Sequence, residues 1–142
     1  MTRALELARE AAGDNEVPVG AVVVRDGTIV GEGRNRTRAD NDPTAHAELV
    51  AIRAAAIRLG TARLTECALH VTLEPCPMCA GAISHARIAR LYYGASDPKG
   101  GGVEHGARVF AHPQCLYAPE IFAGIGADES ARMLRSFFAE RR

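Results

Sequence analysis

Apolar residues recur at helical spacing in several stretches of the chain. Near the start, Leu5, Ala8 and Ala12 share one helical face, charged residues occupy most of the remaining surface, and Gly13 ends the pattern. Similar spacing returns three times further along. The pattern predicts four helices over residues 3–12, 43–59, 76–85 and 127–142, and a short fifth helix over 103–110.

Runs rich in β-branched and aromatic residues predict five strands over residues 17–24, 28–33, 67–73, 90–94 and, more weakly, 120–125. Asp26 and Gly27 form a typical hairpin turn, so the first two strands should pair antiparallel. The third strand, the helix after it and the fourth strand form a βαβ unit, which implies parallel strands joined by a right-handed crossover. The order of elements therefore indicates an α/β fold in which helices pack on a mixed sheet.

Composition adds limits on size and location. With 142 residues, 47% of them hydrophobic, the chain suits a single domain over residues 1–142 that buries roughly 68–70% of its unfolded surface. No apolar run approaches the ~18 residues of a membrane span, and the chain begins with a helical pattern instead of a signal-peptide core. Four cysteines without a disulfide framework fit a reducing compartment. We therefore expect a cytoplasmic protein that does not enter the membrane.

Cys76 and Cys79 form a Cys-x-x-Cys pair where an apolar strand gives way to a helix. Unpaired amides and the positive end of the helix dipole lower the pKa of thiols at a helix start, which favours the metal-binding thiolate. Taken alone, such a pair is more often half of a structural zinc site or a redox pair than a catalytic centre.

His46 and Glu48 change that interpretation. A catalytic zinc takes three protein ligands and keeps a fourth position for water, and His46 is the natural third ligand, although a lone histidine on an apolar helix is usually a packed core residue. Residues i and i+2 of a regular helix point roughly 200° apart, so His46 and Glu48 can face one ion only from the first turn. Asp42 as N-cap and Pro43 at the first helical position would place them there. We therefore predict one catalytic zinc per chain, with Glu48 moving protons.

Other candidate groups are weaker. The segment 33–38 leads into the predicted ligand helix, which makes Asn35 a candidate substrate contact. The glycine run 100–102 lacks a phosphate-binding pattern and is interpreted as a flexible loop. The four histidines outside the motif are interpreted as non-ligands: His70, His85, His105 and His112.

The His-x-Glu and Pro-Cys-x-x-Cys pairing matches a known signature of zinc nucleobase deaminases, those that act on tRNA included. Four longer motifs and a short C-terminal one resemble the bacterial tRNA-specific adenosine deaminases of the TadA type. They are 16–20 (EVPVG), 43–48 (PTAHAE), 73–82 (LEPCPMCAGA), 93–99 (YGASDPK) and 136–138 (SFF). The resemblance covers nearly the whole chain.

This resemblance implies a three-layer α/β/α cytidine-deaminase-like fold with a mixed five-stranded sheet. It implies Zn²⁺ on His46, Cys76 and Cys79, with Glu48 as the catalytic proton shuttle. It also implies a homodimer that hydrolyses the wobble adenosine in the anticodon stem-loop of an arginine tRNA to inosine. Substrate contacts are then expected from Asn35 on the flipped base and from four further residues: Ala47, Asp97, Arg141 and Arg142.

The charge balance keeps other functions open. Lys plus Arg and Asp plus Glu both number 17, whereas nucleic-acid binders usually carry a basic excess. A tRNA substrate therefore requires Arg34, Arg36, Arg38 and the basic C-terminus to share a face. A free nucleobase or nucleoside deaminase of the guanine or cytidine type would use the same zinc site without such a surface. A third possibility is a non-catalytic zinc module that binds RNA or protein, in which Glu48 would have no task.

Overall fold

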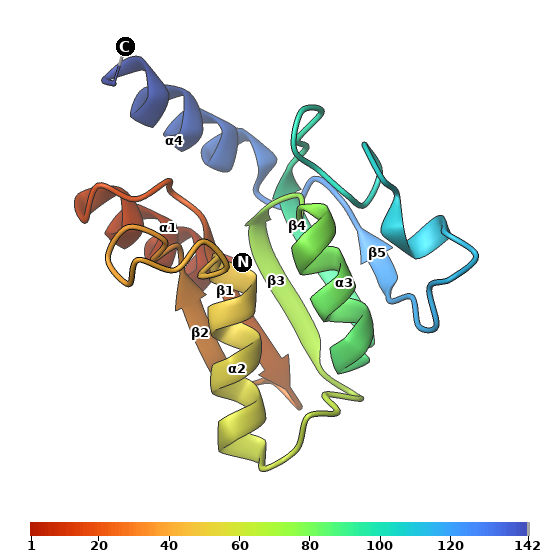
Figure 1. The fold of residues 1–142 in the computed structure, drawn as a ribbon. Helices are drawn as coiled ribbons and strands as arrows, with labels where there is room; N and C mark the ends of the chain where they lie inside the picture. Colours follow the sequence, from red (N-terminus) through yellow and green to blue (C-terminus); the bar gives the residue numbers. More distant parts are fainter. Residues whose placement is uncertain (142) are drawn as a thin grey trace.

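The computed structural model describes residues 1–141. Within these residues the elements follow in the order α1 (Thr2–Gly13), β1 (Gly20–Arg25), β2 (Thr28–Arg34), α2 (Ala47–Leu59), β3 (Ala68–Leu73), α3 (Pro77–Ala86), β4 (Arg90–Ala95), the 3-10 helix η1 (Val109–Ala111), β5 (Glu120–Phe122) and α4 (Ala127–Ala139). Figure 1 shows their arrangement. The four main predicted helices and the five predicted strands are all present, with some changed boundaries.

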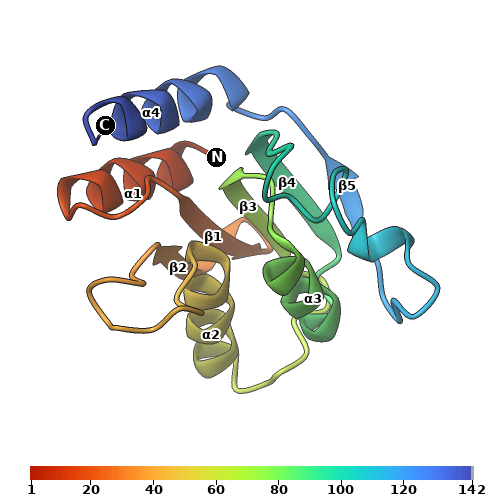
Figure 2. The same ribbon diagram turned by 45° about the horizontal axis from the view of Figure 1, so that its top comes forward.

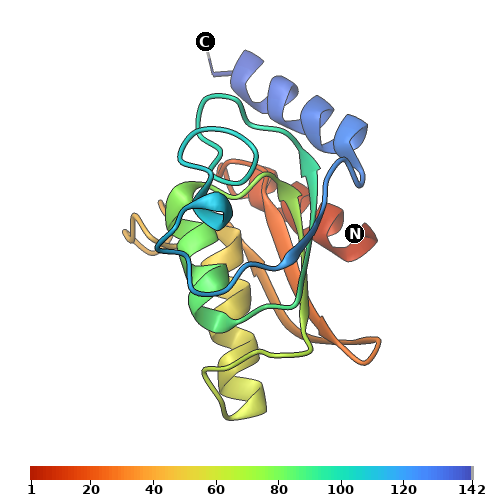
Figure 3. The same cartoon turned by 90° about the vertical axis from the view of Figure 1, so that its right-hand side faces the viewer.

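The strands form one sheet in the order β2-β1-β3-β4-β5. β1 pairs antiparallel with both β2 and β3, and β4 pairs parallel with β3 and β5. Helices α2 and α3 cover one face of the sheet (Figure 3), while α1 and α4 lie side by side on the other (Figure 2). The predicted mixed sheet, the βαβ unit and the three-layer α/β/α architecture are confirmed.

Helix α2 lies unusually close to the sheet because both surfaces carry small residues. Its buried side chains include Ala47, Ala51 and Ala55, and β2 presents Gly31 and Gly33 to them. A Cβ atom added at Gly33 would lie 2.3 Å from the Ala47 carbonyl oxygen, and one at Gly31 would lie 2.4 Å from that of Ala51. Real Cβ contacts are not this short, so glycine at these two positions of β2 is what allows α2 to pack so close to the sheet.

The start of α2 differs from the prediction. Asp42 was expected to cap the helix, but the helix begins at Ala47 with His46 as its N-cap. The Asp42 carboxylate instead accepts hydrogen bonds from the Thr44 amide (2.9 Å) and the Thr44 hydroxyl (2.7 Å). Asp side chains make such local turns as readily as helix caps, and here the turn is formed.

A further prediction is wrong in detail. In place of the helix expected over 103–110 the chain has only the 3-10 helix η1 at its end, and the amides of Val103, Glu104 and His105 donate to a carboxylate oxygen of Glu74. On α4, Phe137 is buried and Phe138 is 49% exposed. No helix within the described residues is long and apolar enough to cross a membrane.

Candidate metal centre

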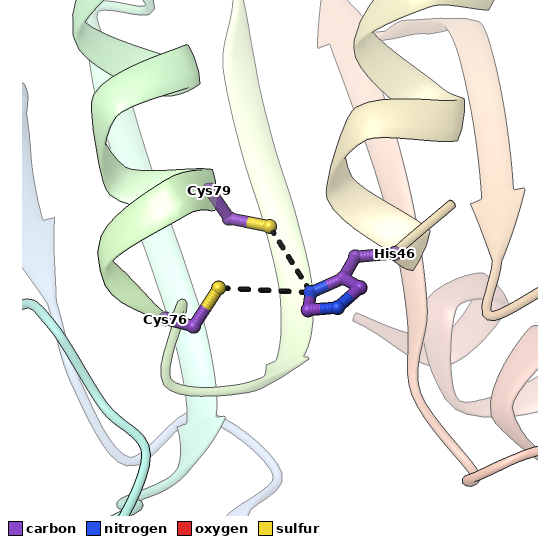
Figure 4. Close-up of side chains that lie close together, drawn as sticks. All are labelled: His46, Cys76 and Cys79. Atoms are coloured by element: carbon purple, nitrogen blue, oxygen red, sulfur yellow. Dashed lines mark hydrogen bonds between the residues drawn. The ribbon is translucent and has the colours of Figure 1, made fainter. Parts of the chain in front are cut away.

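Three side chains converge where α2 and α3 begin. His46 is the N-cap of α2 and Cys76 the N-cap of α3, while Cys79 lies in the first turn of α3. The Nδ1 atom of His46 lies 3.6 Å from the Sγ of Cys76 and 3.5 Å from the Sγ of Cys79 (Figure 4). All three donor atoms lie within 4.8 Å of one another, and among residues 1–141 no other His, Cys, Asp or Glu cluster has this geometry.

The spacing of these atoms suits a tetrahedral zinc ion. Zn–S and Zn–N bonds of about 2.3 and 2.0–2.1 Å at a tetrahedral angle separate sulfur from nitrogen by about 3.6 Å. The two measured separations are 3.6 and 3.5 Å. One imidazole and two thiols also form a donor set typical of zinc, and three protein ligands leave a fourth position for water.

Glu48 lies beside this cluster at the second position of α2. His46 has extended backbone angles (φ −74°, ψ 152°), so it stands outside the helix and the 200° separation of a regular helix does not apply. The expectation that both residues occupy the helix start is therefore met, although the helix begins later. Glu48 is 4% exposed. Burial, reinforced by the negative charge of Cys76, raises its pKa to about 7.

The pKa values of the two thiols are shifted in opposite directions. A hydrogen bond from the Cys79 thiol, and then one with His46, lowers the pKa of Cys76 to about 4. The same bond to Cys76, together with burial, raises the pKa of Cys79. Interaction with Cys76 in turn raises the pKa of His46. A divalent cation binds cysteine as the thiolate, so metal binding at this cluster would release protons.

Asn35 lies next to the centre and supports it. Its Oδ1 accepts a hydrogen bond of 2.9 Å from the Ala47 amide, the first amide of α2, which the His46 side chain leaves uncapped. The sequence placed Asn35 correctly near the site, but this capping role was not foreseen. Ala47 is 0% exposed and contributes to the core, so it presents no surface to a substrate.

Asp97 and Arg141 line a cleft of about 810 Å³ together with Lys99 and Phe138. The cleft lies at the carboxyl-terminal ends of β3 and β4, the same end from which Cys76 follows β3. Arg141 is held within the protein: its guanidinium bonds to the Asn15 side chain and to the Phe137 carbonyl, and lies over the Phe137 ring. Arg142 lies outside the described residues.

Two of the three arginines of segment 33–38 form ion pairs within the protein. Arg34 forms ion pairs with Glu10 (2.6 Å) and Asp14 (3.0 Å), and Arg36 pairs with Asp40 through two hydrogen bonds. The charges of Arg34 and Arg36 are therefore balanced within the protein, while Arg38 donates to the Asn15 carbonyl and forms no ion pair among residues 1–141. In the part of the chain that the structure describes, Lys99, Arg132 and Arg135 form no ion pair.

Two buried carboxylates near the site were not identified from the sequence. Glu16, 3% exposed, accepts hydrogen bonds from the Arg38 and Ala39 amides and so anchors the segment before α2. Glu74, 2% exposed, precedes the ligand turn. Burial would raise its pKa, but hydrogen bonds, the largest from the Asp97 amide and His105, hold it below its usual range. The available signal for Glu74 was an acidic residue directly after an apolar strand.

Known proteins share this arrangement. Residues 1–95 match the family described as the cytidine and deoxycytidylate deaminase zinc-binding region. A tRNA-specific adenosine deaminase of Agrobacterium fabrum is 56% identical over 142 residues, which is 100% of this chain and 93% of that protein. A structure from studies of A-to-I editing by tRNA:A34 deaminases at the wobble position has a TM-score of 0.91 at 56% identity, covering 92% of this chain and 95% of that one. Guanine deaminase from Bacillus subtilis has a TM-score of 0.67 at 35% identity, covering 99% of this chain and 90% of that one.

Proposed function

The chain belongs to the zinc-binding cytidine and deoxycytidylate deaminase family, and from this premise we propose that it deaminates adenosine to inosine at the wobble position of a tRNA anticodon. The observation that carries the proposal is the His46, Cys76 and Cys79 cluster with the buried Glu48 beside it. Similarity to tRNA deaminases, higher in both identity and TM-score than that to the guanine deaminase, supports the choice of substrate.

His46, Cys76 and Cys79 would hold one zinc ion per chain, and their donor geometry fits it. When bound, zinc lowers the pKa of a coordinated water from ~15.7 towards ~7 and so supplies a nucleophile at neutral pH. The positive charge also favours the thiolate form of both cysteines.

Glu48 moves the protons that hydrolytic deamination requires. The oxygen of one water bonds to C6 of adenine, the bond from C6 to the amino nitrogen breaks, and ammonia leaves. Of the two water protons, one ends on the ring nitrogen N1 and the other on the departing amine. Glu48 is suited to both transfers because its carboxyl group is 4% exposed and stands two residues from the ligand His46, at the start of α2.

The cleft at the carboxyl-terminal ends of β3 and β4 lies at the end of the sheet from which Cys76 follows β3, and it offers a surface for a substrate larger than a free base. A base in an anticodon loop is already exposed, so extruding it costs little, and affinity comes from flanking nucleotides. Phe138 is 49% exposed and lines the cleft with the unpaired Lys99. An aromatic ring and a cation are the groups that hold single-stranded RNA, and stacking contributes ~1–3 kcal/mol per base. By the resemblance we extend the proposal to an arginine tRNA, a homodimer and the cytoplasm.

The test measures ammonia release and inosine formation by zinc-loaded protein on the anticodon stem-loop of an arginine tRNA, free adenosine, guanine and cytidine. We expect turnover of the stem-loop and little of the free compounds. Glu48→Gln should keep the metal while turnover falls by ~10²–10⁴, and Glu66→Gln on the exposed surface is the matched control.

Each alternative function predicts a different outcome of this assay. Comparable turnover of guanine or cytidine would indicate a free-base or nucleoside deaminase. A zinc-loaded protein that binds RNA and releases no ammonia from any substrate would be a binding module. Activity of Glu48→Gln within a few-fold of the wild type would show that another group carries the protons.

A further inference from the structure

The chemistry proposed above does not use Glu74, although its carboxylate is 2% exposed and engaged in five hydrogen bonds. Oε1 accepts from the Asp97 amide (3.0 Å) and from the His105 ring (2.7 Å). Oε2 accepts from the successive amides of Val103, Glu104 and His105 at 3.2, 3.0 and 3.1 Å. Successive amides directed at one anion form a backbone nest, and here the chain itself supplies the anion.

The glycine run beside this nest is packed tightly and is not the flexible loop that its composition suggested. Gly101 and Gly102 are both buried. A Cβ atom at Gly101 would lie 2.4 Å from Oε2 of Glu74, and one at Gly102 would lie 2.6 Å from the nitrogen of Pro77. Glycine is therefore required at both positions, because the loop backbone lies directly against Glu74 and the ligand turn.

The ligand turn has few hydrogen-bond donors of its own. Prolines at 75 and 77 flank Cys76, and proline has no N–H group. The turn is held instead from the loop, since the Gly102 amide donates to the Pro75 carbonyl at 2.8 Å. Just before the turn, the Glu74 amide donates to the Ala95 carbonyl at 2.8 Å. The position of Cys76 thus depends on a loop that Glu74 organises.

We propose that Glu74 is a positioning residue of the metal centre: its carboxylate fills the nest of residues 103–105 and clamps the loop 97–105 against the turn that carries Cys76. Through this clamp it fixes the Sγ of Cys76 relative to His46 and Cys79. The inference rests on the proposed zinc ligands but not on the substrate, so a failure of the tRNA assay leaves it standing.

The test uses the full chain loaded with zinc and mixed with excess chelating dye, and it follows the rate of zinc release. Glu74→Gln keeps the volume but replaces one acceptor oxygen by an NH₂ group, so several of the five donors lose their partner. We expect zinc release about 10–100-fold faster, the range typical of residues that support metal ligands. His105→Phe removes one hydrogen bond and should give a smaller increase in the same direction.

Leu91→Ala is the control for general loss of stability, because it truncates a fully buried core residue of β4 that makes none of these hydrogen bonds. It should lower the melting temperature and leave zinc release at the wild-type rate. In cobalt-substituted protein, the absorption bands of the tetrahedral thiolate site should change in Glu74→Gln and not in Leu91→Ala. Wild-type release from Glu74→Gln, or equal acceleration by Leu91→Ala, would overturn the proposal. If Glu74→Gln does not fold, zinc release from His105→Phe at the wild-type rate would overturn the proposal.

Discussion

The contact between β2 and α2 makes a quantitative prediction for Gly33→Ala. The added Cβ atom would lie 2.3 Å from the Ala47 carbonyl oxygen and 2.6 Å from the Ala51 amide nitrogen, both backbone atoms that cannot rotate away. To restore an ordinary contact of 3.4 Å, α2 must move off the sheet by about 1 Å. Because His46 directly precedes Ala47, this movement would lengthen the His46–Cys76 and His46–Cys79 separations.

Two effects of this movement can be calculated. Overpacking against backbone costs about 3 kcal/mol at the upper end of its usual range, which for a domain of this size lowers Tm by about 10 °C. Misplacing a catalytic group by about 1 Å costs roughly 10²-fold in rate. Gly33→Ala should therefore melt earlier, retain zinc less tightly and lose most of its activity even when saturated with metal.

Gly13→Ala provides the matched comparison. Gly13 ends α1, and an added Cβ atom there has nothing within 4 Å, so alanine should be neutral or stabilising by up to about 1 kcal/mol. Thermal unfolding, metal content and initial rates would be measured on both variants and the wild type. A Gly33→Ala protein with the Tm and activity of the wild type would show that the spacing of α2 from β2 does not govern the site.

Other expected outcomes follow from individual groups. Cys79→Ser should lose zinc and Cys67→Ser should keep it, as measured by metal analysis; zinc retained in Cys79→Ser would exclude that ligand. Lys99→Ala should reduce the salt dependence of tRNA binding by about one counterion, while Arg34→Ala, already neutralised by Glu10 and Asp14, should not; equal slopes would remove Lys99 from the RNA contact. Burial lowers the pKa of His70 to about 4, below its unfolded value of 6.5, so protonation favours unfolding and stability should fall as the pH drops from 6.5 towards 4. The free energy of unfolding, measured by chemical denaturation, should fall by on the order of 2 kcal/mol in the wild type over this pH range and by less in His70→Phe. The same pH dependence in the wild type and in His70→Phe would contradict this prediction.

The elements and the cluster of candidate metal ligands could be predicted because their signals are local. Helical spacing and β-branched runs reflect burial of one face, and the sheet in the structure follows them from β1 to β4. The ligand cluster also follows from local features, since Cys76 and Cys79 share one helix start and His46 begins the other helix of that layer. The donor distances confirm that the three residues meet, as their spacing in the sequence suggested.

The sequence-based predictions that were wrong or incomplete concern groups that can bond to more than one partner, often one distant in the sequence. Asp42 has two suitable structures available to it, a cap and a local turn, and nothing local decides between them. The amides of residues 103–105 bond to a carboxylate 29 to 31 positions away. Arg34 similarly pairs with Glu10 across 24 residues. A count of charges cannot reveal such pairing, so the sequence did not show that Arg34 and Arg36 are neutralised by nearby carboxylates.

The candidate metal ligands come from the starts of two helices, and His46 and Cys76 are 30 residues apart in the chain. An ion bound to all of them joins α2 to α3 and binds only the folded protein, so its binding free energy adds to the stability of the fold. At a free zinc concentration 100 times the dissociation constant, this linkage contributes about 2.7 kcal/mol. Since proteases act on the unfolded fraction, the lifetime of this protein in a cell would depend on the zinc supply. Scarcity of the metal would then reduce the amount of enzyme as well as the activity of each molecule.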